Sequence, residues 1–162
     1  MAAHRNRQLV ATGIRAPGFR LTRLDGGEAG LGDLISTGPV LLAFFKITCP
    51  VCQLTLPFLD RLNTPPGLSV YGISQNDVED TTDFVHTYRL RFPMLLDTEE
   101  SGFPISNAYG ISSVPTSFLV ETDGVISRVI EGWNRQEIEW LGARLGIAAI
   151  GAADRVPDWK AG

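Results

Sequence analysis

Cys49 and Cys52 are the only two cysteines in the 162-residue chain, and Pro50 and Val51 separate them. If these residues begin a helix, the cysteines lie one turn apart, at roughly 5–6 Å between α-carbons, which a disulfide can span. Such a pair can cycle between dithiol and disulfide, with Cys49 attacking a substrate sulfur and Cys52 resolving the mixed disulfide. The spacing predicts a redox-active Cys49–Cys52 pair that needs no other cofactor.

The residues around the cysteines predict a strand, a sharp turn and a helix. Residues 40–45 are apolar without alternation, which is typical of a central strand covered on both faces. Pro50 suits the first position of a helix, where no backbone N–H is needed, so Cys49 becomes the N-cap. A helical stripe of apolar side chains then follows at Val51, Leu54, Phe58 and Leu62.

An N-cap position would favour reactivity at Cys49. The first turn of a helix carries unpaired N–H donors and the positive end of the dipole. A thiolate on Cys49 could accept hydrogen bonds from the amides of Val51 and Cys52, and the thiolate is the nucleophile. Lys46 has two interpretations: a cation that tunes the acidity of the nearby thiol, or a snorkelling side chain at the end of an apolar strand.

Other roles for the two cysteines fit the sequence less well. A structural disulfide framework needs more cysteines at wider spacing, and a zinc site needs two further ligands. The only histidines, His4 and His86, have no partner motif, so no metal site is predicted. The remaining alternative is a pair of buried thiols that act as small hydrophobic groups. The strand-turn-helix context favours redox chemistry over that alternative.

Composition is that of an ordinary globular domain. Hydrophobic residues make up 44% and charged residues 20% of the chain, and the net charge of −4 argues against nucleic acid or an anionic membrane as the main partner. No stretch is apolar for the length that spans a bilayer. The first residues do not form a recognisable signal peptide, so a cytoplasmic location is expected.

Turn signals and apolar periodicity predict the remaining elements. Strands are expected at 19–24, 28–34 (as a short strand and a turn), 68–74, 92–97, 116–120 and 125–130. Helices are expected after Asn76 or Asp77, over 101–109, and from Asn134 to Leu145. This order predicts an α/β fold with helices on both faces of the sheet. We expect a flexible arm at 1–15, one domain at 16–146 and a tail at 147–162.

Several short motifs together resemble the thioredoxin superfamily, in particular TlpA/ResA-like thiol-disulfide oxidoreductases and AhpC/TSA redoxins. They are Cys49-Pro-Val-Cys52 after a buried strand, Pro57 in the following helix, Val114-Pro115-Thr116 before a hairpin, Ala16-Pro17-Gly18-Phe19, residues 71–74, residues 92–97 and Glu131-Gly132. The resemblance implies a thioredoxin-like (glutaredoxin-type) mixed sheet with an N-terminal β-hairpin and an inserted helix-strand unit.

The resemblance also implies how a substrate is held. Val114 would offer backbone hydrogen bonds to an extended substrate, next to a cis Pro115 that has no N–H. An ordinary trans turn is the alternative for Pro115, since cis bonds are a small minority before proline. Thr48 and Pro50 would flank the bound substrate. The implied partners are a protein or small-molecule disulfide or thiol and a separate reductant. Two departures from thioredoxins are Thr48 in place of tryptophan and Ala43 in place of a buried acid.

Two other functions fit the same fold. A peroxiredoxin-like, antioxidant thiol peroxidase would carry Pro-x-x-x-Thr-x-x-Cys, but Cys49 stands three residues before Cys52, and Lys46 three residues before Cys49. Copper-carrying redoxins use a longer cysteine spacing and a later histidine, and no histidine follows His86. A Cys-x-x-Cys thiol-disulfide oxidoreductase is therefore the prediction, with thiol peroxidase as the alternative and copper carriage behind both.

Overall fold

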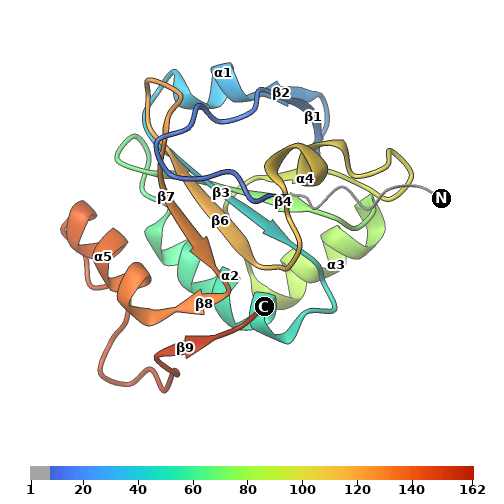
Figure 1. Cartoon of the computed structure of the whole chain (residues 1–162). Coiled ribbons are helices and arrows are strands. Elements are labelled where there is room, and N and C mark those ends of the chain that lie inside the picture. The colour runs from blue at the N-terminus through green and yellow to red at the C-terminus, as the bar shows by residue number, and fades with distance from the viewer. Residues whose placement is uncertain (1–7) are drawn as a thin grey trace.

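The computed structural model describes residues 8–162, so the start of the predicted flexible arm lies outside the described residues. Within them, the main sheet has seven strands in the order β2-β1-β5-β4-β3-β6-β7 (Figure 1). The strands are β1 (Arg20–Arg23), β2 (Glu28–Gly30), β3 (Val40–Phe45), β4 (Ser69–Ser74), β5 (Met94–Leu96), β6 (Thr116–Val120), β7 (Ile126–Glu131), β8 (Trp133–Asn134) and β9 (Trp159–Lys160). The helices are α1 (Leu31–Ile35), α2 (Pro50–Leu62), α3 (Val78–Tyr88), α4 (Pro104–Tyr109) and α5 (Arg135–Leu145).

Strand β3 lies in the interior of the sheet and delivers the chain to the cysteines. It pairs in parallel with β4 and antiparallel with β6, and all six of its residues are buried. Burial on both faces explains why its sequence shows no alternation of apolar and polar residues. The predicted central strand is confirmed, and its C-terminal end leads within four residues to Cys49.

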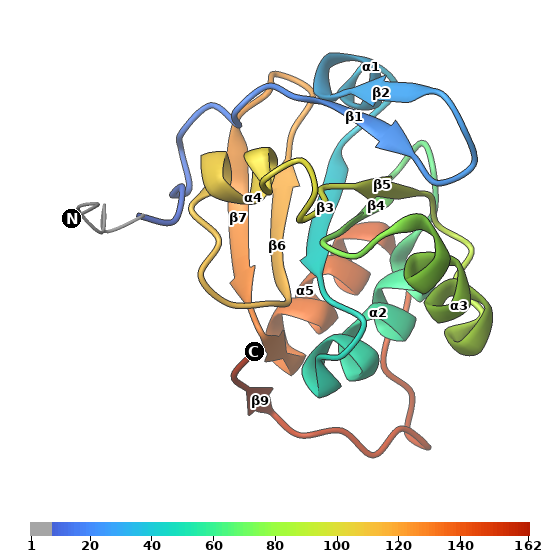
Figure 2. The same cartoon turned by 90° about the vertical axis from the view of Figure 1, so that its right-hand side faces the viewer.

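The side chains of β3 divide between two hydrophobic clusters. Leu41, Ala43 and Phe45 pack in the cluster that contains the buried faces of α2 and α5 together with Phe84 of α3. The alternate residues of β3 pack in the cluster that contains α1 and Tyr109 of α4. Helices therefore cover both faces of the mixed sheet, as predicted (Figure 2).

Local turn and capping signals position most of the helices and hairpins. The turn at residues 25–27 joins β1 to β2, and the turn at 123–124 joins β6 to β7. The Asp77 side chain accepts a hydrogen bond from the amide of Asp80, and Asn134 accepts one from Glu137. These caps are the ones that the sequence predicts. Over 28–34 the expected short strand is β2, and the expected turn after it is the five-residue helix α1.

The sequence predicts a flexible arm at residues 1–15, but the described part of it, residues 8–15, is hydrogen-bonded to the domain. The amide of Val10 donates to the carbonyl of Tyr109 at 3.1 Å, and that of Gly13 donates to Ile126 at 2.8 Å. The amide of Ile126 returns a bond to Ile14 at 2.9 Å. The segment extends the hydrogen bonding of β7, which its own non-periodic sequence does not indicate.

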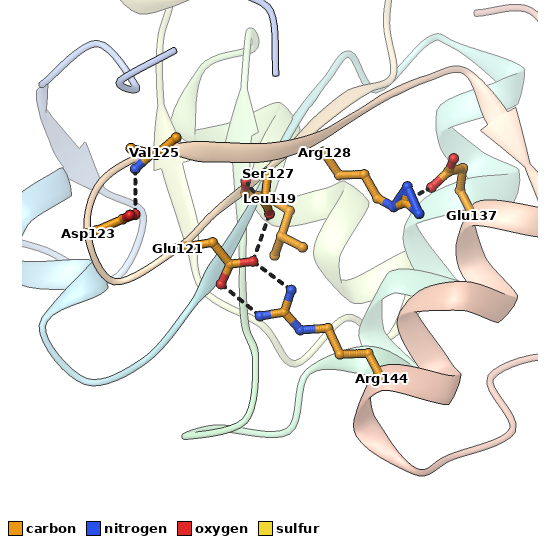
Figure 3. A network of polar contacts seen from close by, with 8 residues as sticks. All are labelled: Leu119, Glu121, Asp123, Val125, Ser127, Arg128, Glu137 and Arg144. Carbon is orange, nitrogen blue, oxygen red and sulfur yellow. Dashed lines mark hydrogen bonds and ion pairs between the residues drawn. The ribbon is translucent and has the colours of Figure 1, made fainter. Parts of the chain in front are cut away.

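Two ion pairs fasten α5 to the β6–β7 hairpin (Figure 3). Arg144 of α5 donates to both carboxylate oxygens of Glu121, at 2.6 and 2.7 Å, and Ser127 donates to the same carboxylate at 2.7 Å. Arg128 of β7 lies 3.1 Å from the carboxylate of Glu137. A bidentate arginine pair fixes direction as well as distance, so the last helix is held in one orientation on the sheet.

Residues 147–162, for which the sequence predicts no secondary structure, pack on the domain as an extended segment. Arg61 of α2 donates to Asp154 at 2.7 Å and to the carbonyl of Ala149 at 3.0 Å. The indole N–H of the fully buried Trp133 donates to the carbonyl of Pro157 at 2.6 Å. Beyond that point β9 pairs antiparallel with β8. The segment thus ends in a separate two-stranded sheet next to the end of β7.

Candidate active site

Cys49 is the N-cap of α2, as predicted. Its backbone is extended, and its sulfur accepts a hydrogen bond from the amide of Cys52 at 3.2 Å. Of the two amides expected to serve this sulfur, only that of Cys52 does so in the part of the chain that the structure describes. Pro50 follows at the first helical position, where its missing N–H removes no hydrogen bond. One N–H group of the helix start, that of Cys52, is therefore aimed at the reactive sulfur.

The loop between β3 and α2 is fixed by side chains from other elements. The amide of Ile47 donates to the side-chain oxygen of Asn76 at 3.0 Å. The carbonyl of the same residue accepts from Gln53 of α2 at 3.0 Å. Both backbone groups of Ile47 are thereby paired, and the loop that carries Cys49 is held from two directions. The sequence analysis identified Asn76 only as a possible helix cap, a position that Asp77 takes instead.

The loop before β6 brings Val114 and Pro115 to the cysteines from 65 residues away in the chain. The bond between these two residues is cis, which confirms that prediction. The Cys49 thiol donates to the carbonyl of Val114 at 3.3 Å. Pro115 is buried, and its carbonyl accepts from the amide of Gly132 at 2.8 Å. The reactive sulfur therefore touches two backbone groups, one donor from α2 and one acceptor from this loop.

The second thiol differs from the first in its surroundings. Cys52 has no exposed surface and lies in the cluster beneath α2, whereas Cys49 is half-buried. Burial raises the pKa of the Cys52 thiol well above its ordinary value, and the hydrogen bond with Cys49 acts in the same direction. The backbone and the charge of Lys46 oppose this rise in pKa. At neutral pH Cys52 is accordingly a protonated thiol held behind Cys49.

The other predicted site residues lie around the mouth of the site. Lys46, Thr48 and Pro50 are exposed. Lys46 also lines a pocket of about 230 Å³ beside the Val114 loop, together with Gln75, Phe103, Ser106, Asn107, Ile111, Ser112 and Ser113. Its charge lowers the pKa of Cys52 against the effect of burial, whereas the sequence left open whether Lys46 tunes Cys49 or is a snorkelling side chain at a strand end. The structure places Thr48 and Pro50 on either side of Cys49 in the chain, and both face solvent.

A buried carboxylate that the sequence analysis did not single out supports this pocket. Asp97, fully buried at the end of β5, accepts from the amides of Ile105 and Ser106 and from the Ser106 hydroxyl, at 2.6–3.1 Å. That hydroxyl in turn accepts from the Gln75 side chain at 2.9 Å. The network holds α4 and hence the segment that runs from it to Val114. An aspartate directly after a buried strand is the one sequence signal that could have identified it.

No cluster of three or more histidine, cysteine, aspartate or glutamate side chains suited to a metal ion is present among residues 8–162. The same residues contain no helix with the length and apolar character needed to cross a membrane. What the site does contain is a half-buried thiol on a helix N-terminus, a backbone carbonyl beside that thiol, and a buried thiol one turn behind it. This arrangement can exchange one disulfide for another.

Comparison with known proteins agrees with this geometry. Residues 12–129 match the AhpC/TSA family. Thiol-disulfide oxidoreductase ResA from Bacillus thuringiensis (strain Al Hakam) is 29% identical over 139 residues, covering 83% of this chain and 78% of that protein. An aligned region that spans 83% of this chain necessarily includes residues 49–52.

Solved structures share the fold. The thioredoxin domain of a thiol-disulfide oxidoreductase from Bacteroides vulgatus superposes with a TM-score of 0.72 at 21% identity, covering 86% of this chain and 99% of that one. Peroxidoxin BcpB from Mycobacterium tuberculosis superposes with a TM-score of 0.69 at 22% identity, covering 85% and 97%. The predicted thioredoxin-like fold is confirmed. Because proteins named for different chemistries share it, the cysteine site must decide the reaction.

Proposed function

We propose that Cys49 is the attacking thiol and Cys52 the resolving thiol of this chain, which belongs to the AhpC/TSA family and is a thiol-disulfide oxidoreductase. One observation carries this assignment. The Cys49 sulfur is half-buried and accepts the Cys52 amide, whereas the Cys52 sulfur has no exposed surface. A substrate disulfide can reach the first sulfur directly and the second only after the first has reacted.

In the first step the Cys49 thiolate attacks one sulfur of a substrate disulfide. A bond forms between Cys49 and that sulfur, the substrate disulfide breaks, and the other substrate sulfur leaves as a thiolate. The amide of Cys52, 3.2 Å from the attacking sulfur, stabilises the anion before the bond forms. The proton lost by Cys49 is available to the departing thiolate through solvent at the exposed mouth of the site.

In the second step Cys52 attacks the Cys49 sulfur of the mixed disulfide. The Cys49–Cys52 bond forms, the remaining substrate thiolate leaves, and the Cys52 proton is transferred to it. Over both steps the protein dithiol loses two electrons and two protons, and the substrate disulfide gains them. An external dithiol returns the protein to its reduced form by the same steps in reverse. The high pKa of Cys52 makes loss of its proton the demanding part of this sequence.

The substrate is a disulfide or thiol of a protein or of a small molecule. Three features support a site open to such groups: the exposed positions of Thr48 and Pro50, the backbone of Val114 beside Cys49, and the pocket next to Lys46. Backbone groups beside a reactive sulfur suit an extended chain, because they recognise any sequence that flanks the substrate cysteine.

Reduction of a disulfide substrate with dithiothreitol as electron donor tests the proposal. Cys49→Ser is expected to abolish reduction, because an alcohol at this position cannot form the mixed disulfide. Rapid consumption of hydrogen peroxide with no disulfide reduction would instead favour the thiol peroxidase alternative. Stoichiometric copper binding with neither reaction would contradict both enzymatic functions.

A further inference from the structure

The last residues of the chain lie against the reactive site. In Figures 1 and 2 the C-terminal end of the chain lies at the same end of the sheet as the start of α2. A Cβ atom placed on Gly162 would lie 2.1 Å from the carbonyl oxygen of Val114 and 3.2 Å from the nitrogen of Pro115. The Cys49 thiol donates to this same Val114 carbonyl at 3.3 Å. The chain end and the reactive sulfur therefore share one backbone group.

The path of this segment is set by strand pairing and by a glycine. Trp133 pairs with Lys160 and Asn134 with Trp159 in the β8–β9 ladder. A Cβ on Gly132 would lie 2.3 Å from the carbonyl oxygen of Lys160 and 3.1 Å from the amide nitrogen of Gly162. Only glycine leaves room for this close approach, and Gly132 also has a positive φ of 69°. The close fit places residues 160–162 across the edge between Gly132 and Val114.

We propose that residues 159–162 determine substrate specificity, because they occupy the strand edge beside Cys49 that an extended polypeptide would use. This inference rests on the proposed function of Cys49. A substrate cysteine that reaches Cys49 carries its flanking chain past Val114, where the backbone is the surface available for strand-like pairing. The segment 159–162 already lies there. A polypeptide substrate must displace it, and a compact disulfide need not.

Residues 159–162 are held firmly enough to compete with a polypeptide substrate for the backbone of Val114, and loosely enough to be displaced by it. Their first anchors lie upstream, in the bonds from Trp133 to Pro157 and from the Arg135 amide to Asp158 at 2.9 Å, and the short β8–β9 ladder adds the pairing of Trp159 and Lys160. Beyond Asp158 the side chains bury little: Trp159 is 61% exposed, and Lys160 through Gly162 are exposed. Residues 159–162 can therefore detach while the preceding residues keep their contacts.

A pocket beside Val114 is not covered by residues 159–162. The pocket of about 230 Å³ beside Val114 is lined by residues before α2, at the end of β4 and around α4, and by none of the residues 159–162. That volume is of the size of an amino-acid side chain and its backbone, so it suits one half of a compact disulfide. Among residues 8–162, Lys46 is the only charged residue in its lining, and it favours compact disulfides that carry a carboxylate.

A variant that ends at Asp158 tests the proposal. It keeps the Trp133 and Arg135 bonds and removes residues 159–162 together with the β8–β9 ladder. Reduction of insulin is expected to become about fivefold faster, the factor for a competitor held by one or two net hydrogen bonds. Reduction of cystine is expected to change by less than about twofold. A synthetic peptide of residues 155–162 should slow insulin reduction by the shortened variant and leave cystine reduction unaffected.

Two point variants keep the test independent of any effect of shortening on folding. Gly162→Ala should push the last residue off the Val114 carbonyl and raise the insulin rate, whereas Gly32→Ala adds the same methyl group where no atom lies within 4 Å. An unchanged or slower insulin rate in both the shortened variant and Gly162→Ala would overturn the proposal. If that happened while Cys49→Ser still abolished all reduction, the role of residues 159–162 would be wrong and the proposed function of Cys49 would stand. Failure of the specificity proposal and failure of the proposed function are therefore distinguishable.

Discussion

Cys49 and Cys52 lie one turn apart on one helix, yet they occupy different environments. Cys49 is half-buried at the helix N-cap and contacts the Cys52 amide and the Val114 carbonyl. Cys52 is fully buried in the cluster beneath α2, and its burial raises the pKa of its thiol. A spacing of three residues thus makes the Cys49 thiol accessible to substrate and leaves the Cys52 thiol in contact with Cys49 only inside the protein.

This difference teaches that the order of the two steps follows from burial. The exposed sulfur must react first, because the buried one has no access to substrate. The buried sulfur then finds its target, the Cys49 sulfur, already within one helical turn, which replaces a collision in solution by a reaction within one molecule.

The largest effect is expected from Cys52→Ser. The first step remains and the second is lost, so steady-state disulfide reduction should fall by at least about a hundredfold. A covalent mixed disulfide between Cys49 and the substrate should accumulate and be visible as an added mass in intact-protein mass spectrometry. Normal turnover, or an adduct on the variant Cys49→Ser instead, would reverse the assignment of the two thiols.

The second effect concerns pH. Because the Cys52 pKa is raised, the thiol is protonated at neutral pH, and its thiolate fraction grows as pH rises towards that pKa. The rate of closing the Cys49–Cys52 disulfide should therefore increase about tenfold for each pH unit from about pH 6 to pH 8. Stopped-flow measurement on a preformed mixed disulfide gives this rate directly. A rate that is flat over this range would contradict the raised pKa.

A smaller effect is expected at the loop that positions Cys49. Asn76→Ala leaves the Ile47 amide without its side-chain acceptor, which should cost about 1 kcal/mol in the free energy of unfolding. The first step should slow several-fold, since the loop that holds the sulfur loses one of its two ties. Asn76→Asp keeps an acceptor oxygen and serves as the matched control. Equal rates in Asn76→Ala and the unaltered protein would show that this tie does not position the sulfur.

The smallest effect is expected from Lys46→Gln. The charge of Lys46 lowers the pKa of Cys52 against the larger effect of burial, so its removal should slow disulfide closure by about two- to threefold at neutral pH. Since Lys46 is exposed, the effect should shrink in high salt, and Lys46→Arg should preserve the rate. A change confined to the first step would mean that Lys46 acts on Cys49, which is one of the two interpretations that the sequence allows.

The parts of this site that depend on neighbours in sequence were predictable. The apolar run of β3, the proline after Cys49 and the stripe along α2 fix the strand, the turn and the helix by local physics. The approach of the Val114–Pro115 loop was implied only by the family resemblance, because nothing in its own sequence indicates where it packs. The fold was therefore largely predictable, and the order of the two cysteines within it followed from the helix.

The contacts that complete the site could not be predicted. The bond from Ile47 to Asn76 joins two loops whose distance depends on the pairing of β3 with β4. Residues 147–162 have no periodicity, and their path depends on Trp133 and Arg61 far earlier in the chain. Their partners are single backbone and side-chain groups, which leave no pattern in a sequence. The contact of Gly162 with Val114 could not be predicted either, because it too joins single backbone groups.

Alkylation of the reduced, folded protein tests the difference between the cysteines most directly. Brief treatment with iodoacetamide at neutral pH, followed by peptide mass spectrometry, measures the rate at each sulfur separately. We predict that Cys49 is modified at least about a hundred times faster than Cys52, because Cys52 is buried and protonated. Equal rates at the two sulfurs, or faster modification of Cys52, would contradict the assignment of Cys49 as the attacking thiol.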